Sequence, residues 1–143
     1  MKYTLESAKK SDIEMLKKYK LASILDYAIN MDNEEKIKIE KYVNENISKQ
    51  LNDYKIIKID NNNIGCLLIE NFNDGILLDE IYLEEKFRGK KIGTNIINDV
   101  LNDHNIVYLW VYKNNKDAIK LYKRLGFKEV ETTESRIFMK FEK

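Results

Sequence analysis

Proline is absent from this sequence of 143 residues, and cysteine and histidine occur once each, at Cys66 and His104. Without proline, the chain must turn at glycine, asparagine or aspartate. A single cysteine excludes an internal disulfide bond. One cysteine and one histidine cannot supply the ligands of a zinc cluster, so we expect no metal site of that kind.

No sign of charge dominates, because 25 basic residues face 24 acidic ones. A chain without a strong field of one sign is a poor candidate for binding nucleic acid or a membrane surface. Apolar runs such as residues 64–69 are far shorter than the roughly 20 residues of a membrane span, and no signal-peptide core follows Met1. We therefore expect a cytoplasmic protein. Its 43% hydrophobic residues suffice for one domain, residues 1–143.

Hydrophobic periodicity predicts an α/β protein, in an α+β layered arrangement. Ser11, with Glu14 three residues later, forms a capping-box pattern that predicts a helix start. The apolar and aromatic run 106–112 is typical of a central strand covered on both faces. The expected strands are 2–7, 54–59, 64–71, 75–83, 106–112 and a hairpin after Phe127, and the expected helices begin at Ser11 and span 33–51, 91–102 and 115–125. This order predicts a mixed sheet of about seven strands flanked by about four helices, with a parallel crossover from 75–83 to 106–112.

A basic, glycine-containing loop precedes the third helix, with the sequence Phe-Arg-Gly-Lys-Lys-Ile-Gly-Thr over residues 87–94. Backbone amides at a helix N-terminus attract anions, and glycine lets a phosphate approach the main chain. The spacings of the Walker loop and of the dinucleotide-binding loop are absent, which counts against nucleotide hydrolysis and hydride transfer. Taken alone, such a glycine spacing is more often a solvated basic turn, but its position in the predicted crossover favours an anion site.

A second motif makes the pattern more specific. About twenty residues after the loop come Asn115, Ala118, Leu121, Tyr122, Leu125, Gly126 and Phe127. Together, the two motifs resemble the GNAT superfamily of acyl-CoA-dependent N-acetyltransferases. Arg88 and Gly93 match the ends of that family's Arg/Gln-x-x-Gly-x-Gly/Ala loop, whereas Lys91 replaces its middle glycine and Glu85 replaces a frequent proline. The motifs cover residues 77–127, and the remaining elements follow the family's order.

The resemblance implies a single GNAT-like domain that uses acetyl-CoA as cosubstrate. Main-chain groups of the strand before the loop would hold the pantetheine arm, the loop would hold the pyrophosphate, Asn115 would bond the far end of the cofactor, and Tyr122 would stand near the sulfur. The implied strand residues are Ile81, Tyr82 and Leu83, and the implied loop residues are Arg88, Gly89, Lys90, Lys91, Ile92, Gly93 and Thr94.

Acetyl transfer to an amine needs a proton acceptor and a proton donor. Releasing the proton of an alkylammonium with a pKa near 10.4 costs roughly 4 to 5 kcal/mol at pH 7. Strand alternation places Asp79 on one face with Leu77, Ile81 and Leu83, which makes it the first candidate base; Glu80 takes that place if a bulge reverses the alternation. Tyr122 is the candidate acid for the departing thiolate, although helical spacing alone would make it a core residue.

Other conspicuous residues have simpler interpretations. Cys66, in an apolar run, is expected to be a buried small hydrophobe, and His104, in a polar turn, is expected to be exposed. Trp110 and its neighbours Tyr108 and Tyr112 are better explained by packing than by base stacking. The acidic segment 26–35, with Asp26, Tyr27, Asp32, Glu34 and Glu35, would line the acceptor site in the resembling family and favours a cationic amine.

Three functions compete. The first is an acetyl-CoA-dependent N-acetyltransferase, in which a primary amine of a small molecule or peptide attacks directly in a ternary complex. The second is a catalytically inactive CoA-binding regulatory module. The third is a nucleic-acid or anion-binding domain using Lys86, Arg88, Lys90 and Lys91, which the balanced charge disfavours. A homodimer is the base-rate expectation for oligomeric state.

Overall fold

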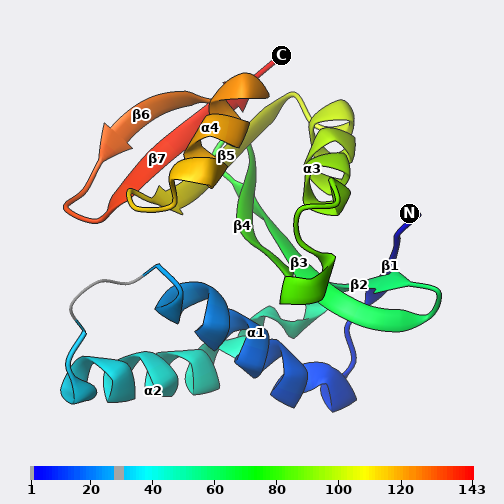
Figure 1. The fold of residues 1–143 in the computed structure, drawn as a ribbon, viewed down its shortest axis with the longest axis vertical. Helices are drawn as coiled ribbons and strands as arrows, with labels where there is room; N and C mark the ends of the chain where they lie inside the picture. Colours follow the sequence, from blue (N-terminus) through cyan, green and yellow to red (C-terminus); the bar gives the residue numbers. More distant parts are fainter. Residues whose placement is uncertain (1, 28–30) are drawn as a thin grey trace. The chain divides into compact units, whose positions relative to one another are not determined.

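The computed structural model describes residues 2–27 and 31–143, shown as a ribbon in Figure 1. Within these ranges there are four α-helices and seven strands, as the sequence predicts. The helices are α1 (Ile13–Leu25), α2 (Asn33–Gln50), α3 (Ile92–Asp103) and α4 (Lys116–Arg124). The strands are β1 (Thr4–Ser7), β2 (Tyr54–Ile59), β3 (Asn62–Phe72), β4 (Gly75–Leu83), β5 (Ile106–Tyr112), β6 (Lys128–Thr132) and β7 (Arg136–Glu142). Three short 3₁₀ helices are also present: η1 (Lys10–Asp12), η2 (Leu51–Asp53) and η3 (Glu85–Phe87).

The strands form one mixed sheet in the order β1-β2-β3-β4-β5-β7-β6. Strands β4 and β5 pair in parallel, with Ile76 opposite Val107, and α3 connects them. The pairs β1–β2, β2–β3, β5–β7 and β6–β7 are antiparallel. The predicted mixed sheet and its parallel crossover are therefore confirmed.

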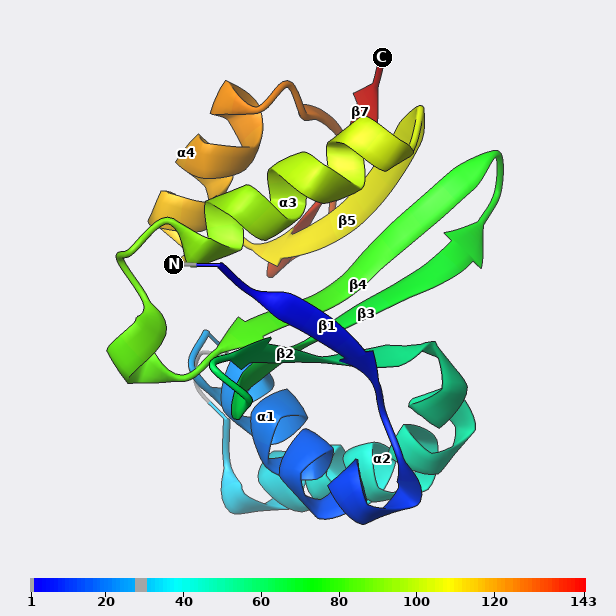
Figure 2. The ribbon, with the colours of Figure 1, turned by 90° about the vertical axis from the view of Figure 1, so that its right-hand side faces the viewer.

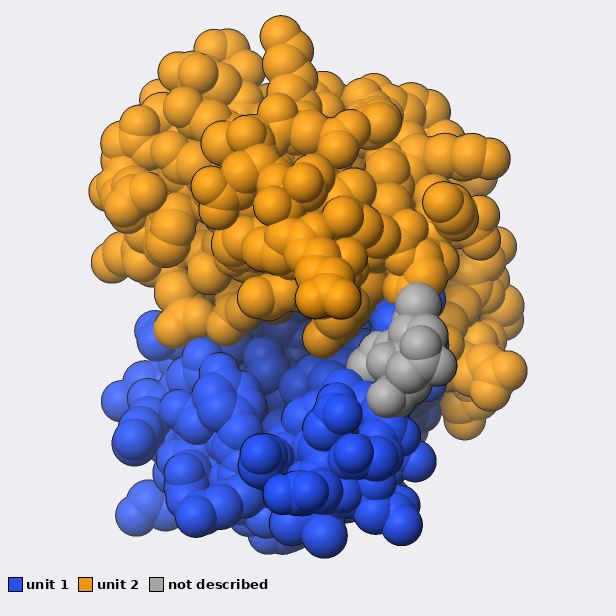
Figure 3. All heavy atoms as spheres, turned by 90° about the vertical axis from the view of Figure 1, so that its left-hand side faces the viewer, with its two compact units in different colours: residues 1–68, 80–84 blue, residues 69–79, 85–143 orange. Residues whose placement is uncertain are grey.

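Two compact units make up the chain, as Figure 3 shows by colour. Unit 1 contains Met1–Leu68 and Glu80–Glu84, and unit 2 contains Ile69–Asp79 and Glu85–Lys143. Strands β3 and β4 each contribute one part to unit 1 and the other part to unit 2. The expectation of a single domain over residues 1–143 stays a prediction.

In unit 1, α1 and α2 lie side by side and pack against strands β2 and β3 (Figure 1). Asp32 begins α2 as its N-cap, with its carboxylate accepting a hydrogen bond from Glu35 N at 2.8 Å. The apolar side chains of both helices meet alternate residues of the strands in one core, formed by Leu16, Tyr19, Val43, Ile47, Tyr54, Ile56, Cys66 and Leu68.

In unit 2, α3 and α4 lie on one side of β5, as Figure 2 shows. Val107, Leu109 and Val111 of β5 are buried, and β7 places Met139 beside Leu109 and Ile137 beside Val111. The buried side of α3 is formed by Ile92, Ile96, Ile97, Val100 and Leu101. This arrangement places the N-terminus of α3 directly after the loop that the sequence singles out.

The opposite face of β5 differs from the prediction, because Trp110 and Tyr112 are only partly buried. Aromatic side chains of unit 2 cover that face by packing on one another. The Phe138 ring stacks on Tyr108 at 5.4 Å and meets Trp110 at 4.7 Å, and the Arg136 guanidinium lies 4.6 Å from the Trp110 ring. Packing among side chains therefore accounts for these aromatic residues, as predicted.

Two local predictions are wrong. Ser11 does not cap α1: it lies within the 3₁₀ turn η1, and Asp12 is the N-cap and accepts a hydrogen bond from Lys9 N at 2.8 Å. His104 is half-buried rather than exposed, because its ring nitrogen Nδ1 lies 2.9 Å from the Val100 carbonyl oxygen at the end of α3. In both cases a polar side chain lies within hydrogen-bond distance of a backbone group near a helix end.

Asparagine and aspartate form the tight turns between β2 and β3 and between β3 and β4, as the absence of proline predicts. Asp60, Asn61 and Asn73 adopt positive φ angles of 51°, 66° and 48°. In the part of the chain that the structure describes, no helix is long and apolar enough to cross a membrane.

Candidate active site

The loop before α3 has a backbone suited to binding an anion. Gly89 has a φ of 74° and Lys91 a φ of 65°, so the chain passes twice through the left-handed region just before the helix. The first helical hydrogen bond runs from Asn95 N to the Lys91 carbonyl oxygen at 3.0 Å. The amides of Ile92, Gly93 and Thr94 precede it and have no acceptor within the helix, which gives this terminus its partial positive charge.

Exposed cations surround this backbone. Arg88, Lys90 and Lys91 are all exposed. The ammonium groups of Lys86 and Lys90 lie 5.4 Å and 5.9 Å from the centre of the Phe87 ring, a cation–π arrangement that keeps both near the loop. Beside Gly89, a Cβ atom would meet no atom within 4 Å, so the backbone is open to a ligand there.

Helix α4 positions two further predicted site residues, Asn115 and Tyr122. Asn115 is its N-cap, and the side-chain oxygen Oδ1 accepts a hydrogen bond from Ala118 N at 3.3 Å. This bond orients the amide and leaves Nδ2 as its donor group. Tyr122, on the same helix, packs edge-to-face on Phe127 with ring centres 5.5 Å apart, and Phe127 N donates to the Tyr122 carbonyl oxygen at 2.9 Å. The Tyr122 ring therefore packs against Phe127, the residue that precedes β6.

The two predicted carboxylates of β4 have opposite environments. Asp79, in unit 2, is exposed, whereas Glu80, in unit 1, is 6% exposed. The next residues, Ile81, Tyr82 and Leu83, are half-buried in unit 1. Tyr82 stacks on Tyr19 of α1 at 4.9 Å.

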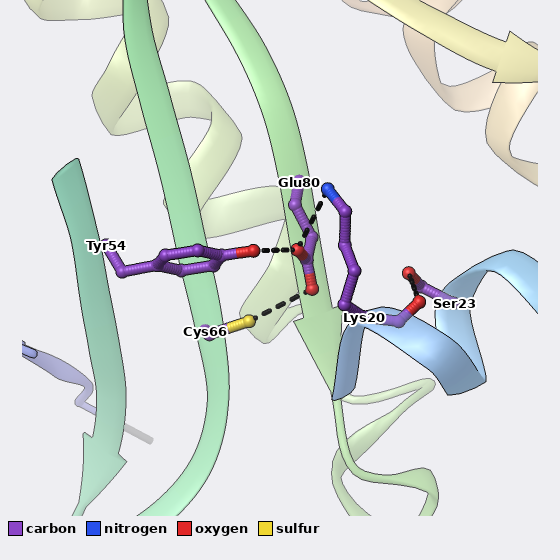
Figure 4. Close-up of polar contacts among 5 residues, drawn as sticks. All are labelled: Lys20, Ser23, Tyr54, Cys66 and Glu80. Carbon is purple, nitrogen blue, oxygen red and sulfur yellow. Dashed lines mark hydrogen bonds and ion pairs between the residues drawn. The ribbon is translucent and has the colours of Figure 1, made fainter. Parts of the chain in front are cut away.

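A network of polar side chains surrounds Glu80, as Figure 4 shows. Tyr54 donates its hydroxyl to Glu80 Oε1 at 2.7 Å, and the Cys66 thiol donates to Glu80 Oε2 at 3.2 Å. The ammonium nitrogen Nζ of Lys20 lies 3.3 Å from Glu80 Oε1. Burial, followed by the nearby Glu80 carboxylate, raises the pKa of the Cys66 thiol well above its ordinary value. Cys66 is therefore buried, as predicted, and also serves as a hydrogen-bond donor.

Tyr19 of α1 makes a second tyrosine–carboxylate contact, with Glu84, the residue that follows β4. Tyr19 donates its hydroxyl to Glu84 Oε2 at 2.6 Å. Burial, the hydrogen bond to Glu84 and the charge of that carboxylate raise the pKa of the Tyr19 phenol. The sequence interpretation missed Lys20, Tyr54, Tyr19 and Glu84, because their partners are far away along the chain and lysine is too frequent here for one to stand out.

The predicted site residues fall into two groups. The loop residues 88–94, Asn115, Tyr122 and Asp79 belong to unit 2, and residues 80–83 belong to unit 1. The predicted acceptor segment 26–35 is described in part: Asp26 and Tyr27 follow α1 in a turn, Glu34 and Glu35 lie in the first turn of α2, and residues 28–30 lie outside the described residues.

The loop, the helix it opens and the Asn115–Phe127 segment lie within one stretch of the chain that matches a known protein family. The acetyltransferase (GNAT) family matches residues 20–127 of the chain. The protein belongs to the GNAT acetyltransferase family. The resemblance found in the two sequence motifs is thereby confirmed.

Relatives of this GNAT protein match over part of their length. It is 42% identical over 67 residues to an uncharacterized N-acetyltransferase of Methanocaldococcus jannaschii. The matched segment covers 43% of this chain and 30% of that relative. It is 30% identical over 64 residues to spermine/spermidine N(1)-acetyltransferase of Bacillus subtilis. This match covers 41% of this chain and 42% of that protein. The matches thus span less than half of either relative.

The fold is shared with solved GNAT structures over the whole chain. The PaiA N-acetyltransferase of Thermoplasma acidophilum, crystallised in complex with coenzyme A, has a TM-score of 0.77 to this chain, 21% sequence identity and 100% coverage of both chains. At that identity, the likeness concerns the fold.

Proposed function

We propose that this protein is an acetyl-CoA-dependent N-acetyltransferase that acts on a primary amine. The observation that carries the proposal is the loop of residues 88–94, which combines open backbone at Gly89, exposed cations and the N-terminus of α3. Such a terminus is a binding site for phosphate groups. Membership of the GNAT family and the coenzyme A complex of the Thermoplasma acidophilum protein support the same ligand.

Each group of the loop and of α4 has a role in this proposal. The amides of residues 89–94 hold the pyrophosphate, and Arg88, Lys90 and Lys91 supply positive charge. Main-chain groups of Ile81, Tyr82 and Leu83 bond the pantetheine arm, and Nδ2 of Asn115 donates to the cofactor while Oδ1 continues to cap α4. Acetyl-CoA supplies the acetyl thioester.

The reaction needs two proton transfers. The acceptor's amine loses a proton, and its nitrogen forms a bond to the thioester carbonyl carbon. Tyr122 then donates its phenolic proton to the sulfur as the carbon–sulfur bond breaks, which yields the acetylated amine and CoA. Asp79 and Glu80 are the proposed proton acceptors, acting directly or through water. Asp79 is exposed and can return the proton to solvent, and Glu80 is held in place by Tyr54.

Thermal unfolding in the presence of acetyl-CoA and of CoA tests the cofactor site. A ligand that binds only the folded state at about a hundred times its Kd adds about 2.7 kcal/mol, which corresponds to a rise in Tm of about 5 to 10 °C for a chain of this size. We expect both ligands to raise Tm, and Arg88→Gln to weaken the effect. Arg124→Gln, which changes an exposed arginine at the end of α4, is the matched control. An unchanged Tm at millimolar ligand would contradict the proposal.

Turnover separates an enzyme from a CoA-binding module. With acetyl-CoA and a panel of primary amines, spermidine among them, we expect thiol release from the wild-type protein. Tyr122→Phe removes only the phenolic oxygen, so we expect turnover to fall at least about tenfold with CoA affinity within about threefold. Tight CoA binding with no turnover of any amine would favour the regulatory module. Turnover unaffected by Tyr122→Phe would assign the proton donor elsewhere.

A further inference from the structure

The ion pair between Lys20 of α1 and Glu80 of β4 is nearly removed from solvent (Figure 4). The side chains of Lys20 and Glu80 are 13% and 3% exposed. One turn earlier on the same helix, Lys17 meets Glu14 at a similar 3.4 Å, but the Glu14 side chain is 87% exposed. Burying a charge is costly unless a partner of opposite charge is close, so a cation beside Glu80 is a physical requirement of this site.

The carboxylate of Glu80 is fixed by groups other than Lys20. Tyr54 of β2 bonds Oε1 at 2.7 Å and Cys66 of β3 bonds Oε2 at 3.2 Å, and both of these side chains are fully buried. Three strands of the sheet therefore hold one anionic group in a single orientation. Rigid elements of this kind are the usual support of a ligand-binding group.

The Lys20 ammonium nitrogen lies farther from Glu80 Oε1 than the Tyr54 hydroxyl oxygen does, at 3.3 Å against 2.7 Å. This distance exceeds the 2.7 to 2.9 Å typical of charge-assisted hydrogen bonds. A lysine side chain is a flexible four-carbon stem, and part of this one reaches solvent. Ser23 donates its hydroxyl to the Lys20 carbonyl oxygen at 2.8 Å, a bond to the backbone of α1 that does not involve the Lys20 ammonium group.

We propose that Lys20 occupies the place of the acceptor's ammonium group, and that Glu80, Tyr54 and Cys66 form the receptor for it. This inference rests on the proposed acetyltransferase function and names its substrate class. The occupant that the structure shows is an unbranched alkylammonium. The acceptor is therefore an unbranched aliphatic primary amine, whose methylene chain follows the path that the Lys20 stem vacates. Lys20 competes with it and sets the concentration at which the acceptor binds.

Steady-state kinetics of Lys20→Ala tests this competition, with n-butylamine as acceptor and tert-butylamine as its branched counterpart. We expect the KM for n-butylamine to fall at least tenfold, with kcat within threefold and CoA affinity unchanged. Lys17→Ala, on the same helix, should leave KM as in the wild type. Adding Glu80→Gln to Lys20→Ala should abolish the gain, and tert-butylamine should show no gain in either variant. A KM that is unchanged or raised in a folded Lys20→Ala protein would overturn the inference.

A measurement on the wild-type protein decides the matter if Lys20→Ala does not fold. Nuclear magnetic resonance of protein labelled at the lysine Cε and Nζ atoms reports each ammonium group, and Lys20→Arg identifies the Lys20 signal. In the presence of CoA, n-butylamine should shift the Lys20 signal toward that of a solvated lysine and leave the Lys17 signal unmoved. A Lys20 signal that stays constant up to saturating amine would overturn the inference. Displacement needs no turnover, so failure of the proposed enzyme activity would be recognised separately in the amine panel.

Discussion

Lys91 begins helix α3 in a left-handed backbone conformation, with φ 65° and ψ 11°. For a residue with a side chain this conformation costs roughly 1 kcal/mol, a cost that glycine avoids. The GNAT loop pattern has glycine at this position, whereas this chain places a lysine in a conformation that glycine adopts more readily. The amide that follows remains directed as a helix N-terminus requires, and the exposed side chain adds charge.

We expect Lys91→Gly to raise the free energy of unfolding by about 1 kcal/mol, because it removes the left-handed strain. Urea unfolding followed by circular dichroism measures this change. Lys90→Gly is the matched control, since Lys90 is also exposed and lies outside the residues with positive φ. The Lys90→Gly substitution should not raise the free energy of unfolding. Equal effects of the two substitutions would show that the backbone angle at Lys91 carries no strain.

The Cys66 thiol makes the free energy of unfolding depend on pH in the alkaline range. Its folded pKa is raised, chiefly by burial, so the protonated form is favoured in the folded state and the associated stability is present below the unfolded pKa of about 8.5. That stability is lost as pH rises toward the folded pKa. Between pH 8 and pH 10 we expect wild type to lose about 1 to 2 kcal/mol more than Cys66→Ser, whose hydroxyl does not titrate there and can still donate to Glu80. Parallel urea titrations at the two pH values give the difference; identical pH dependence in both proteins would refute the assignment.

At this scale the sequence could predict burial but not partnership. Cys66 stands in an apolar run, and that was enough to place it in the core. Its hydrogen bond to Glu80 depends on how β3 pairs with β4, and the approach of Lys20 depends on how α1 packs. Neither contact has a local signal, since each joins residues at least fourteen positions apart.

Strands β3 and β4 approach each other closely at Gly65. A Cβ atom there would lie 1.9 Å from the Tyr82 carbonyl oxygen, well inside contact distance. The strands can pair in this way only because Gly65 has no side chain. The apolar run 64–69 predicts a strand, but its periodicity does not reveal which residue must be small.

We expect Gly65→Ala to lower the free energy of unfolding by about 3 kcal/mol or more, because backbone must move to admit the methyl group. Gly89→Ala separates this effect from backbone strain: Gly89 has a φ of 74° and open space beside it, so only the left-handed penalty of about 1 kcal/mol applies. Thermal and urea unfolding of both variants provide the comparison. A Gly65→Ala cost no larger than that of Gly89→Ala would mean that the strands separate easily at this point.

Element positions were more predictable than element ends. The limits of β5 agree with the run 106–112, and those of α2 and β2 differ from the prediction by at most one residue. The start of α1 was wrong because Ser11 and Asp12 are both good capping residues, and the preceding turn tightened into a 3₁₀ helix that uses Asp12. Competition between adjacent capping residues is decided by packing, which the sequence does not display.

For the molecule as a whole, the order of elements predicted the mixed sheet and the parallel β4–β5 pair, because a strand–helix–strand crossover has few alternatives. The division into two compact units had no counterpart in the sequence. No linker separates them: the boundaries fall inside strands β3 and β4 and again at the end of β4. Composition reveals flexible linkers, but it cannot reveal a boundary within a continuous strand.

Strands that belong to both units should make them unfold together, as the predicted single domain over residues 1–143 requires. Neither unit can lose β3 and β4 without removing part of the other's sheet, and chains of this size commonly unfold in one step. The sequence has a single tryptophan, Trp110 in unit 2, whereas the two longest helices, α1 and α2, lie in unit 1. Thermal unfolding followed by Trp110 fluorescence and by helical circular dichroism therefore weights the two units differently.

We expect the same midpoint from both signals, and acetyl-CoA should raise both midpoints equally because it stabilises one cooperative structure. Two separate midpoints would show that the units are independent domains. A shift in midpoint confined to the tryptophan signal would show that acetyl-CoA is held by unit 2 alone.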